Sequence, residues 1–377
     1  MPARAEHHRP RLTPHWARAD GGLLVAAGGL SLVGALLVWS ATRSDAGPAY
    51  LLRHLLNTAI GMVLCAAVMR MDHRTLRAVA PWLYLASIAG LVLVLTPLGS
   101  TINGSHSWIR LPGGFSLQPS EPAKAALCIG MAMILAERWE RQEVPGTRDV
   151  LLALAAAAVP IALVMLQPDL GSALVLAALA LGVVAVSGAP RRWVAGVMAL
   201  GATGVVLALT TPLLSPYQRD RLVAFADPSA DPAGIGYQTR QVRIAIGSGG
   251  WGGQGLFEGR QTQGGFIPFQ QTDFVFSVAG EELGFLGAAG LLLVLGFVVV
   301  RTVLVAAAAR DAFGRLMAAG VAAWLCFQTF ENVGMNLGLM PVTGLPLPFV
   351  SYGGSSMFAC WLAIGLVGNV HLAAQER

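Results

Sequence analysis

Long runs of apolar residues, separated by short polar connections, constrain this chain more than any other feature of its sequence. A helix needs about 20 apolar residues to cross the hydrocarbon core of a bilayer. Charged residues make up only 12% of the chain, against roughly 25% in soluble domains. The sequence therefore predicts an all-α integral membrane protein with about ten transmembrane helices. We place them near residues 21–41, 52–70, 77–97, 120–137, 149–166, 171–188, 193–211, 274–300, 313–336 and 354–373.

Arginines gather in alternate connections between these runs, and this bias predicts the orientation of the chain. Because short cytoplasmic loops are rich in Arg and Lys, we expect a cytoplasmic N-terminal tail (1–20), a polytopic transmembrane domain (21–373) and a cytoplasmic C-terminal tail (374–377). The long connection between the seventh and eighth runs (212–273) then lies on the extracytoplasmic side. Its aliphatic and aromatic content argues against disorder and favours short helices on the outer membrane surface.

Several function classes find no support in the sequence. The net charge is +5, but the basic residues lie between the apolar runs, where they set topology, so no nucleic-acid partner is expected. The four cysteines lie inside apolar runs without paired spacing, which is typical of small buried side chains rather than disulfides or metal ligands. There is no Walker loop, HExxH zinc motif or GxSxG elbow in the sequence, so an ATPase, a metalloprotease and a serine hydrolase are not supported.

Three acids stand at the start of the eighth run, in QQTDFVFSVAGEELGF (270–285). A carboxylate at the outer end of a span, such as Asp273, can be ionised yet partly desolvated, as a general base must be. From the residues alone, an N-cap for the following helix, a role open to Thr272 and Asp273, is the favoured alternative. Glu281 and Glu282 fall on different faces of a helix, so they cannot both join Asp273. We interpret them as interhelical hydrogen-bond partners.

Glu121 and Lys124 are three residues apart at the start of the fourth run, so they share a helix face and can pair. A charge within a membrane costs about 2.5–3.5 kcal/mol even on lenient scales, so such residues are functional candidates. Two interpretations stay open. Either the pair neutralises itself and braces the helix bundle, or Lys124 lies in a polar cavity and receives an anionic group such as a phosphate.

Further candidates lie in the outer connections. Arg219 and Arg221, in YQRDRL, form a basic point suited to a phosphate or an anionic headgroup, with simple contact to the lipid surface as the alternative. Asp169, in QPDLG, is expected to cap the following helix, and a substrate or partner contact is the less favoured interpretation. Trp108 is consistent with an ordinary interfacial tryptophan.

Six motifs occur along the chain in a fixed order, and each is weak alone: NGSHSWI…FSLQPSEPAK, QPDLGSAL, YQRDRLVAFADPSADPAGIGYQ, IAIGSGGWGGQG, TDFVFSVAGEELGF and NVGMNLGLMPVTGLPLPFVSYGGSS. Together they resemble the SEDS family (shape, elongation, division and sporulation), typified by RodA and FtsW. The resemblance covers nearly the whole chain, from the first run to the tenth. PVTGLPLPFVSYGGSS together with TDFVF is closest to the RodA branch.

The resemblance implies a peptidoglycan glycosyltransferase that polymerises lipid II at the outer face of the bacterial cytoplasmic membrane. Elongation, division and sporulation all stay open as its cellular role. Asp273 matches the family's essential aspartate and would take the proton from the acceptor's 4-hydroxyl. The freed oxygen would attack the anomeric carbon of the donor with inversion, and undecaprenyl pyrophosphate would leave. The implied substrate-binding candidates are Lys124, Glu121, Arg219, Arg221, Trp108 and Asp169.

Cationic groups must stabilise the departing pyrophosphate, and Lys124, Arg219 and Arg221 are the candidates for this role. A divalent cation, Mg²⁺ or Mn²⁺, could share it, although no metal-ligand set is expected from the sequence. Two departures from the family pattern stand in the chain. Ser107 precedes Trp108 where the family often has Arg, which weakens the case for phosphate binding by the 103–110 loop. Pro122 replaces a bulky apolar residue, as the first turn of a helix tolerates.

The family usually works with a class B penicillin-binding protein, so a partner helix is expected on the lipid-facing surface. Two other functions remain as alternatives. A lipid II flippase would need polar residues across the full depth of the membrane, whereas the candidates here cluster near the outer face. A non-catalytic scaffold for the penicillin-binding protein would leave a shared cation and carboxylate unexplained.

Overall fold

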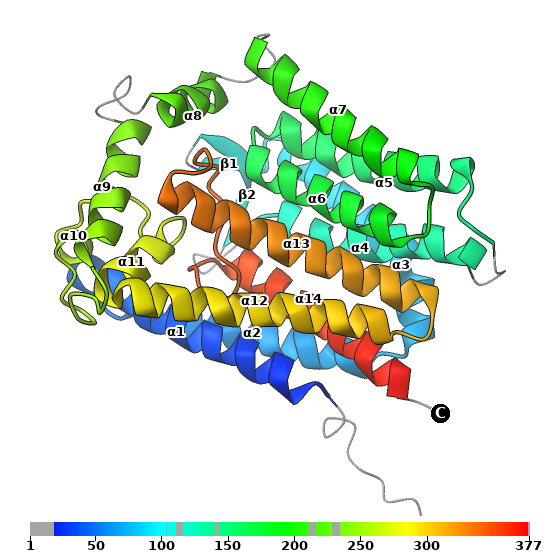
Figure 1. Cartoon of the computed structure of the whole chain (residues 1–377), viewed down its shortest axis with the longest axis horizontal. Coiled ribbons are helices and arrows are strands. Elements are labelled where there is room, and N and C mark those ends of the chain that lie inside the picture. Colours follow the sequence, from blue (N-terminus) through cyan, green and yellow to red (C-terminus); the bar gives the residue numbers. More distant parts are fainter. Residues whose placement is uncertain are drawn as a thin grey trace, which may run out of the picture.

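The computed structural model describes residues 19–102, 104–110, 116–139, 143–210, 216–227 and 234–375. The expected N-terminal tail up to residue 18 and the last two residues of the C-terminal tail lie outside this part of the chain. Long helices lie side by side and form a bundle, and shorter helices gather at the end of the bundle opposite the C-terminus (Figure 1).

Nine of the ten predicted apolar runs each coincide with one long helix, with ends that agree to within five residues. The long helices are α1 (Gly21–Ala46), α2 (Ala49–Arg70), α3 (His73–Val94), α4 (Ser120–Trp139), α5 (Thr147–Leu166), α6 (Leu170–Val186), α7 (Arg191–Thr210), α12 (Gly284–Ala308), α13 (Ala312–Leu337) and α14 (Gly354–Gln375). Six of the described helices are long and apolar enough to cross a membrane. The chain is therefore a multi-pass membrane protein, and the total of ten spans stays a prediction.

Helix α13 runs through the middle of the bundle and is buried along most of its length (Figure 1). Small residues let its neighbours approach closely, as is usual where helices pack in membranes. A Cβ atom on Gly182 of α6 would lie 2.3 Å from the Cβ of Ala323 on α13. A Cβ atom on Gly320 of α13 would lie 3.0 Å from the sulfur of Cys128 on α4. Polar side chains on α13 therefore reach α4 and the loop before α14 directly.

The predicted single helix over 274–300 is wrong. Two helices replace it, α11 (Val275–Glu282) and α12. The helix is interrupted between them, and α12 begins at Gly284, where φ is +67°. A Cβ atom on Gly284 would lie 2.2 Å from the backbone nitrogen of Gly253. The glycine-rich segment 247–255 therefore packs its backbone directly against the break, a contact that only glycine permits at this position.

The long connection contains three short helices, α8 (Pro216–Ala226), α9 (Ile235–Ser248) and α10 (Arg260–Gln263), as predicted. Their predicted place on the membrane surface stays a prediction. The all-α expectation missed one feature, an antiparallel three-stranded sheet formed by β1 (Gly99–Ile102), β2 (Ser105–Arg110) and β3 (Ser116–Leu117) in that order. The strands are too short and too polar to stand out beside the apolar runs.

Candidate active site

A cavity of about 360 Å³ lies between the N-terminal ends of α2, α6 and α14, the strand β2, helix α8 and the loop before α14. Four of the seven site residues predicted from the sequence line it, namely Asp273, Arg221, Trp108 and Asp169. The other three, Lys124, Glu121 and Arg219, are not among its lining residues. Arg219 is exposed on α8 instead.

Asp273 lies in a tight turn that precedes α11. The backbone N–H groups of Thr272 and Asp273 both donate to the carbonyl of Phe269 at 3.1 Å, and Phe269 adopts a left-handed backbone with φ +57°. The N-cap residue of α11 is Phe274, and its side chain makes no capping hydrogen bond to the helix. The interpretation of Asp273 as a helix cap, favoured from the residues alone, is therefore wrong, and its carboxylate lines the cavity.

A cation shares this cavity with the Asp273 carboxylate. Gly344, with φ +79°, separates them: a Cβ atom at this position would lie 3.5 Å from both Arg221 Nη1 and Asp273 Oδ2. Burial raises the pKa of the Asp273 carboxyl above its usual value, and the Arg221 guanidinium and the Thr272 hydroxyl oppose this shift. A partly desolvated carboxylate beside a fixed positive charge is suited to accept a proton near neutral pH.

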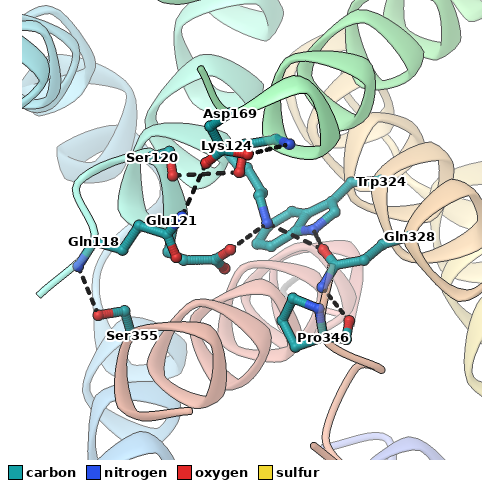
Figure 2. A network of polar contacts seen from close by, with 10 residues as sticks. Gln118, Ser120, Glu121, Lys124, Asp169, Trp324, Gln328, Pro346 and Ser355 are labelled. Atoms are coloured by element: carbon teal, nitrogen blue, oxygen red, sulfur yellow. Dashed lines mark hydrogen bonds and ion pairs between the residues drawn. The ribbon is translucent and has the colours of Figure 1, made fainter. Parts of the chain in front are cut away.

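Asp169 caps the helix that follows it, as predicted. Its Oδ1 atom accepts the backbone N–H of Ser172 in the first turn of α6 at 3.0 Å. Its Oδ2 atom accepts the side-chain amide of Gln118 at 2.9 Å, and the backbone N–H of Gln118 donates to the hydroxyl of Ser355 on α14 (Figure 2). Asp169 thus ties α6, α14 and the segment before α4 together at the cavity wall.

Trp108 lies on β2, in the small sheet that the sequence did not predict, and its side chain contributes to the cavity wall. The sheet is fixed to the bundle by Ser105, whose hydroxyl donates to the carbonyl of Gln167 at 2.8 Å. Trp108 therefore lies at the cavity wall, and its contact with a substrate stays a prediction. Ser107, which stands where the family often has Arg, is 1% exposed and also lines the cavity.

Lys124 and Glu121 lie in the interior of the bundle, with exposed side-chain fractions of 0% and 1%. The Lys124 ammonium lies 2.7 Å from Glu121 Oε1 and 3.1 Å from Gln328 Oε1 on α13 (Figure 2). The Gln328 oxygen also accepts the indole N–H of Trp324, and its amide donates to the carbonyl of Pro346 at 2.9 Å. Of the two interpretations left open by the sequence, this geometry matches the pair that braces the bundle.

Glu281 and Glu282 make the contacts between elements that the sequence predicted, and neither lines the cavity. Glu281 accepts the backbone N–H groups of Gln261 and Thr262 on α10 at 2.7 and 2.9 Å. Glu282 accepts the hydroxyl of Ser40 on α1. These buried carboxylates hold the long connection against the bundle.

Some residues of the cavity were missed by the sequence analysis. Tyr50, Arg53 and Asn57 of α2 line it, as does Tyr352, whose ring meets that of Tyr50 edge-on at 4.8 Å between centroids. The spacing of the three α2 residues, i, i+3 and i+7, places them on one face of the helix. Polar residues on one face of an otherwise apolar run are the sequence feature that could have indicated these cavity residues.

A metal site made of clustered side chains is not present among the described residues. No three His, Cys, Asp or Glu side chains gather there in an arrangement that could hold a metal ion.

Comparison with known proteins decides the family. A model of the cell cycle proteins FtsW, RodA and SpoVE matches residues 19–376. The chain belongs to this family. The SEDS resemblance is thereby confirmed, and it extends over almost the whole chain.

This SEDS protein is similar to characterised and solved relatives over nearly their full length. It is 36% identical to the peptidoglycan glycosyltransferase MrdB of Escherichia coli K12 over 354 residues, which are 93% of each chain. Its fold matches a chain from a peptidoglycan synthase complex with TM-score 0.80, 34% identity and coverage of 95% and 99%. It also matches RodA of Thermus thermophilus with TM-score 0.72, 32% identity and coverage of 97% and 100%.

Proposed function

We propose that this SEDS protein is a peptidoglycan glycosyltransferase that polymerises lipid II, with Asp273 as general base. One observation carries the proposal: the Asp273 carboxylate and the Arg221 guanidinium flank Gly344 in one cavity that is open to a substrate. The 36% identity to a relative named as a peptidoglycan glycosyltransferase supports the same reaction. Fold alone would not support it, because one fold can host many functions.

In the proposed reaction, Asp273 accepts the proton of the acceptor sugar's 4-hydroxyl. The oxygen then forms a bond to the anomeric carbon of the donor, and the bond from that carbon to the pyrophosphate oxygen breaks. The electron pair leaves with undecaprenyl pyrophosphate, and the configuration at the carbon inverts. The raised pKa of Asp273 makes it a stronger base than an ordinary carboxylate.

Arg221 is the cation that we assign to the departing pyrophosphate, because it lines the cavity beside the base. A planar guanidinium can hold a phosphate with two parallel hydrogen bonds, and a fixed positive charge stabilises the negative charge that develops as the bond breaks. Trp108 and Asp169 stand at the cavity wall as further substrate contacts. Any Mg²⁺ or Mn²⁺ would enter with the pyrophosphate, since the described residues offer no cluster of their own.

The proposed reaction requires the cavity to face the outside of the bacterial cytoplasmic membrane, with both termini in the cytoplasm. The arginine-rich connections between the spans support this orientation. We propose a class B penicillin-binding protein as partner, which would cross-link the glycan strands. The similarity to a chain from a peptidoglycan synthase complex supports such an assembly.

The test is polymer formation from purified lipid II by the purified protein, alone and with a class B penicillin-binding protein. Asp273→Asn should lower the rate about 10²–10⁴-fold, the usual contribution of a general base. Asp72→Asn is the matched control, because Asp72 is an exposed cap of α3 and Asn caps equally well. It should leave the rate unchanged.

Two outcomes would contradict the proposal. Full activity of Asp273→Asn would remove the base assignment. Transfer of lipid II across vesicle membranes, with no polymer from the wild-type protein under any condition, would favour the flippase instead. Thermal unfolding of each variant separates a chemical effect from a loss of folded protein.

A further inference from the structure

Helix α11 begins at Val275, two residues after the proposed base, and the side chain of its N-cap residue, Phe274, makes no capping hydrogen bond. The first N–H groups of a helix have no partner within the helix, and aspartate is among the residues that most often fill this need. An Asp273 side chain that turned back onto α11 would be lost to the cavity. The backbone N–H of Ser277 in this first turn donates to the carbonyl of Phe274 at 2.9 Å, and groups from outside the helix supply further contacts.

Two asparagines of α13 supply these contacts from across the bundle. The Oδ1 atom of Asn336 accepts the backbone N–H of Ser277 in α11 at 3.2 Å. Its amide donates to the backbone carbonyl of Asp273 at 3.2 Å. The amide of Asn332 donates to the same carbonyl at 2.9 Å. Both asparagines are fully buried, so these bonds do not compete with water.

We propose that Asn336 and Asn332 are positioning residues for the general base: they cap α11 in place of Asp273 and clamp its backbone, so that its carboxylate stays in the cavity. This inference rests on the proposed function. It concerns residues 59 and 63 positions away from Asp273 along the chain.

The chemistry of asparagine fits this role. At Asn336 one side chain must accept from one backbone group and donate to another, and a neutral amide does both. Aspartate could only accept, and leucine could do neither. The spacing of four residues places both amides on one face of α13.

Asn332 also connects the base to the loop before α14, which forms another part of the cavity wall. The amide of Asn332 donates to the carbonyl of Leu345 at 2.7 Å, next to Gly344, which lies between Asp273 and Arg221. A second link joins these segments, because the backbone N–H of Tyr352 donates to the carbonyl of Gln271 at 2.9 Å. Asn332 therefore holds the backbone of the base and the Gly344 loop against one helix.

The test compares Asn336→Leu with Asn369→Leu in the lipid II polymerisation assay. Asn369 is a matched control on α14: it is buried, and its amide also donates to two backbone carbonyls, those of Val68 and Met71, at 3.2 and 2.7 Å. It does not line the cavity. Both variants lose buried hydrogen bonds, so both should lose stability to a similar degree.

Only Asn336→Leu should change the chemistry. We expect its kcat to fall 10- to 100-fold per folded molecule with KM nearly unchanged. The Asp273 carboxylate would then accept hydrogen bonds from the first N–H groups of α11 for much of the time instead of facing the cavity. A carboxylate that accepts helix N–H groups is stabilised in its charged form, so the acidic limb of kcat should move to lower pH. The other charged groups lining the cavity, Arg221, Arg53 and Asp169, are unchanged in both variants.

Asn336→Gln keeps both hydrogen-bonding groups and should recover part of the lost kcat. Asn336→Ser, which is smaller and keeps a hydroxyl, gives the same comparison if the leucine variant does not fold. Equal kcat per folded molecule in the Asn336 and Asn369 variants, with an unmoved pH profile, would overturn the inference. A wild-type protein that forms no polymer would instead refute the proposed function, so the two failures are distinguishable.

Discussion

Two charged pairs of this protein lie in contrasting surroundings. Lys124 and Glu121 are closed off in the bundle, 2.7 Å apart and almost without exposed surface, with Gln328 completing the contacts of the lysine (Figure 2). Asp273 and Arg221 lie across Gly344 and line an open cavity. A charge that is paired and inaccessible can brace a structure, whereas a charge that faces a cavity can take part in chemistry.

The two pairs are nevertheless mechanically connected. Gln328, which contacts Lys124, donates to the carbonyl of Pro346. Asn332, one turn further along α13, holds both Leu345 and Asp273. The loop that carries Gly344 is thus fixed to α13 from both regions. The interior pair thus contacts a residue that also holds the Gly344 loop, although neither Lys124 nor Glu121 lines the cavity.

The largest expected effect of a substitution on stability is at the interior pair. Lys124→Met leaves the Glu121 carboxylate buried without a cation, which should lower the free energy of unfolding by about 3–5 kcal/mol. Removing both charges, with Lys124→Met and Glu121→Gln together, should restore most of this loss. Thermal unfolding in detergent measures both.

The activity of the same variants tests which interpretation of Lys124 holds. If the pair only braces the bundle, the rate per folded molecule of the double variant should stay close to that of the wild type. A stable double variant with a strongly raised KM for lipid II would instead support the predicted contact between Lys124 and phosphate.

A smaller effect, on the rate alone, is expected at the cavity. Arg221→Ala removes the cation beside the base and should slow polymerisation about 100-fold, the loss typical of one stabilising donor. Arg219→Ala is the matched control, since Arg219 is exposed on the same helix and does not line the cavity. Comparable losses in both variants, measured as kcat at saturating lipid II, would show that Arg221 acts only through the general charge of α8.

The helices could be predicted from the sequence, but the contacts between them could not. Apolar runs of sufficient length determine where a chain crosses a bilayer, so nine of the ten predicted runs each coincide with one long helix. The break at Gly284 escaped detection because the residues on both sides are apolar, and its cause is the backbone of Gly253, far away in the chain. Strand β2 was missed because SHSWIR is short and lacks a clear apolar alternation.

The site divides in the same way. Asp273 and Arg221 were found from their residue type and motif, and Asp169 was identified as a cap from its place before a helix. The cap interpretation of Asp273 is wrong because the N-cap position falls on Phe274, one residue later. The Ser277 N–H donates to Phe274 and to Asn336 of α13, which the sequence could not place nearby. The need for a cation at the pyrophosphate makes Lys124 a substrate-binding candidate, but the sequence cannot show whether a cavity reaches its side chain. In the structure Lys124 is not among the residues that line the cavity.

The smallest expected effect on stability is at the cavity, where the Asp273 carboxylate should reduce the stability of the folded protein at neutral pH. Burial raises the pKa of Asp273 in the folded protein above its unfolded value. Such a group favours the folded state only below its unfolded pKa, and this contribution is lost as the pH rises through the folded pKa. Asp273→Asn should therefore stabilise the protein at neutral pH, by about 0.5–1 kcal/mol, in line with the strain that active sites retain for function.

Thermal unfolding of Asp273→Asn and wild type across a pH series measures this difference. The gain should be present at neutral pH and should disappear as the pH falls below the ordinary range of a carboxyl group, where Asp273 is protonated in both states. Asp72→Asn, on the exposed end of α3, should show no comparable gain. A loss of stability for Asp273→Asn at neutral pH would mean that the Arg221 attraction outweighs burial, and that the cavity pair braces the fold as the interior pair does.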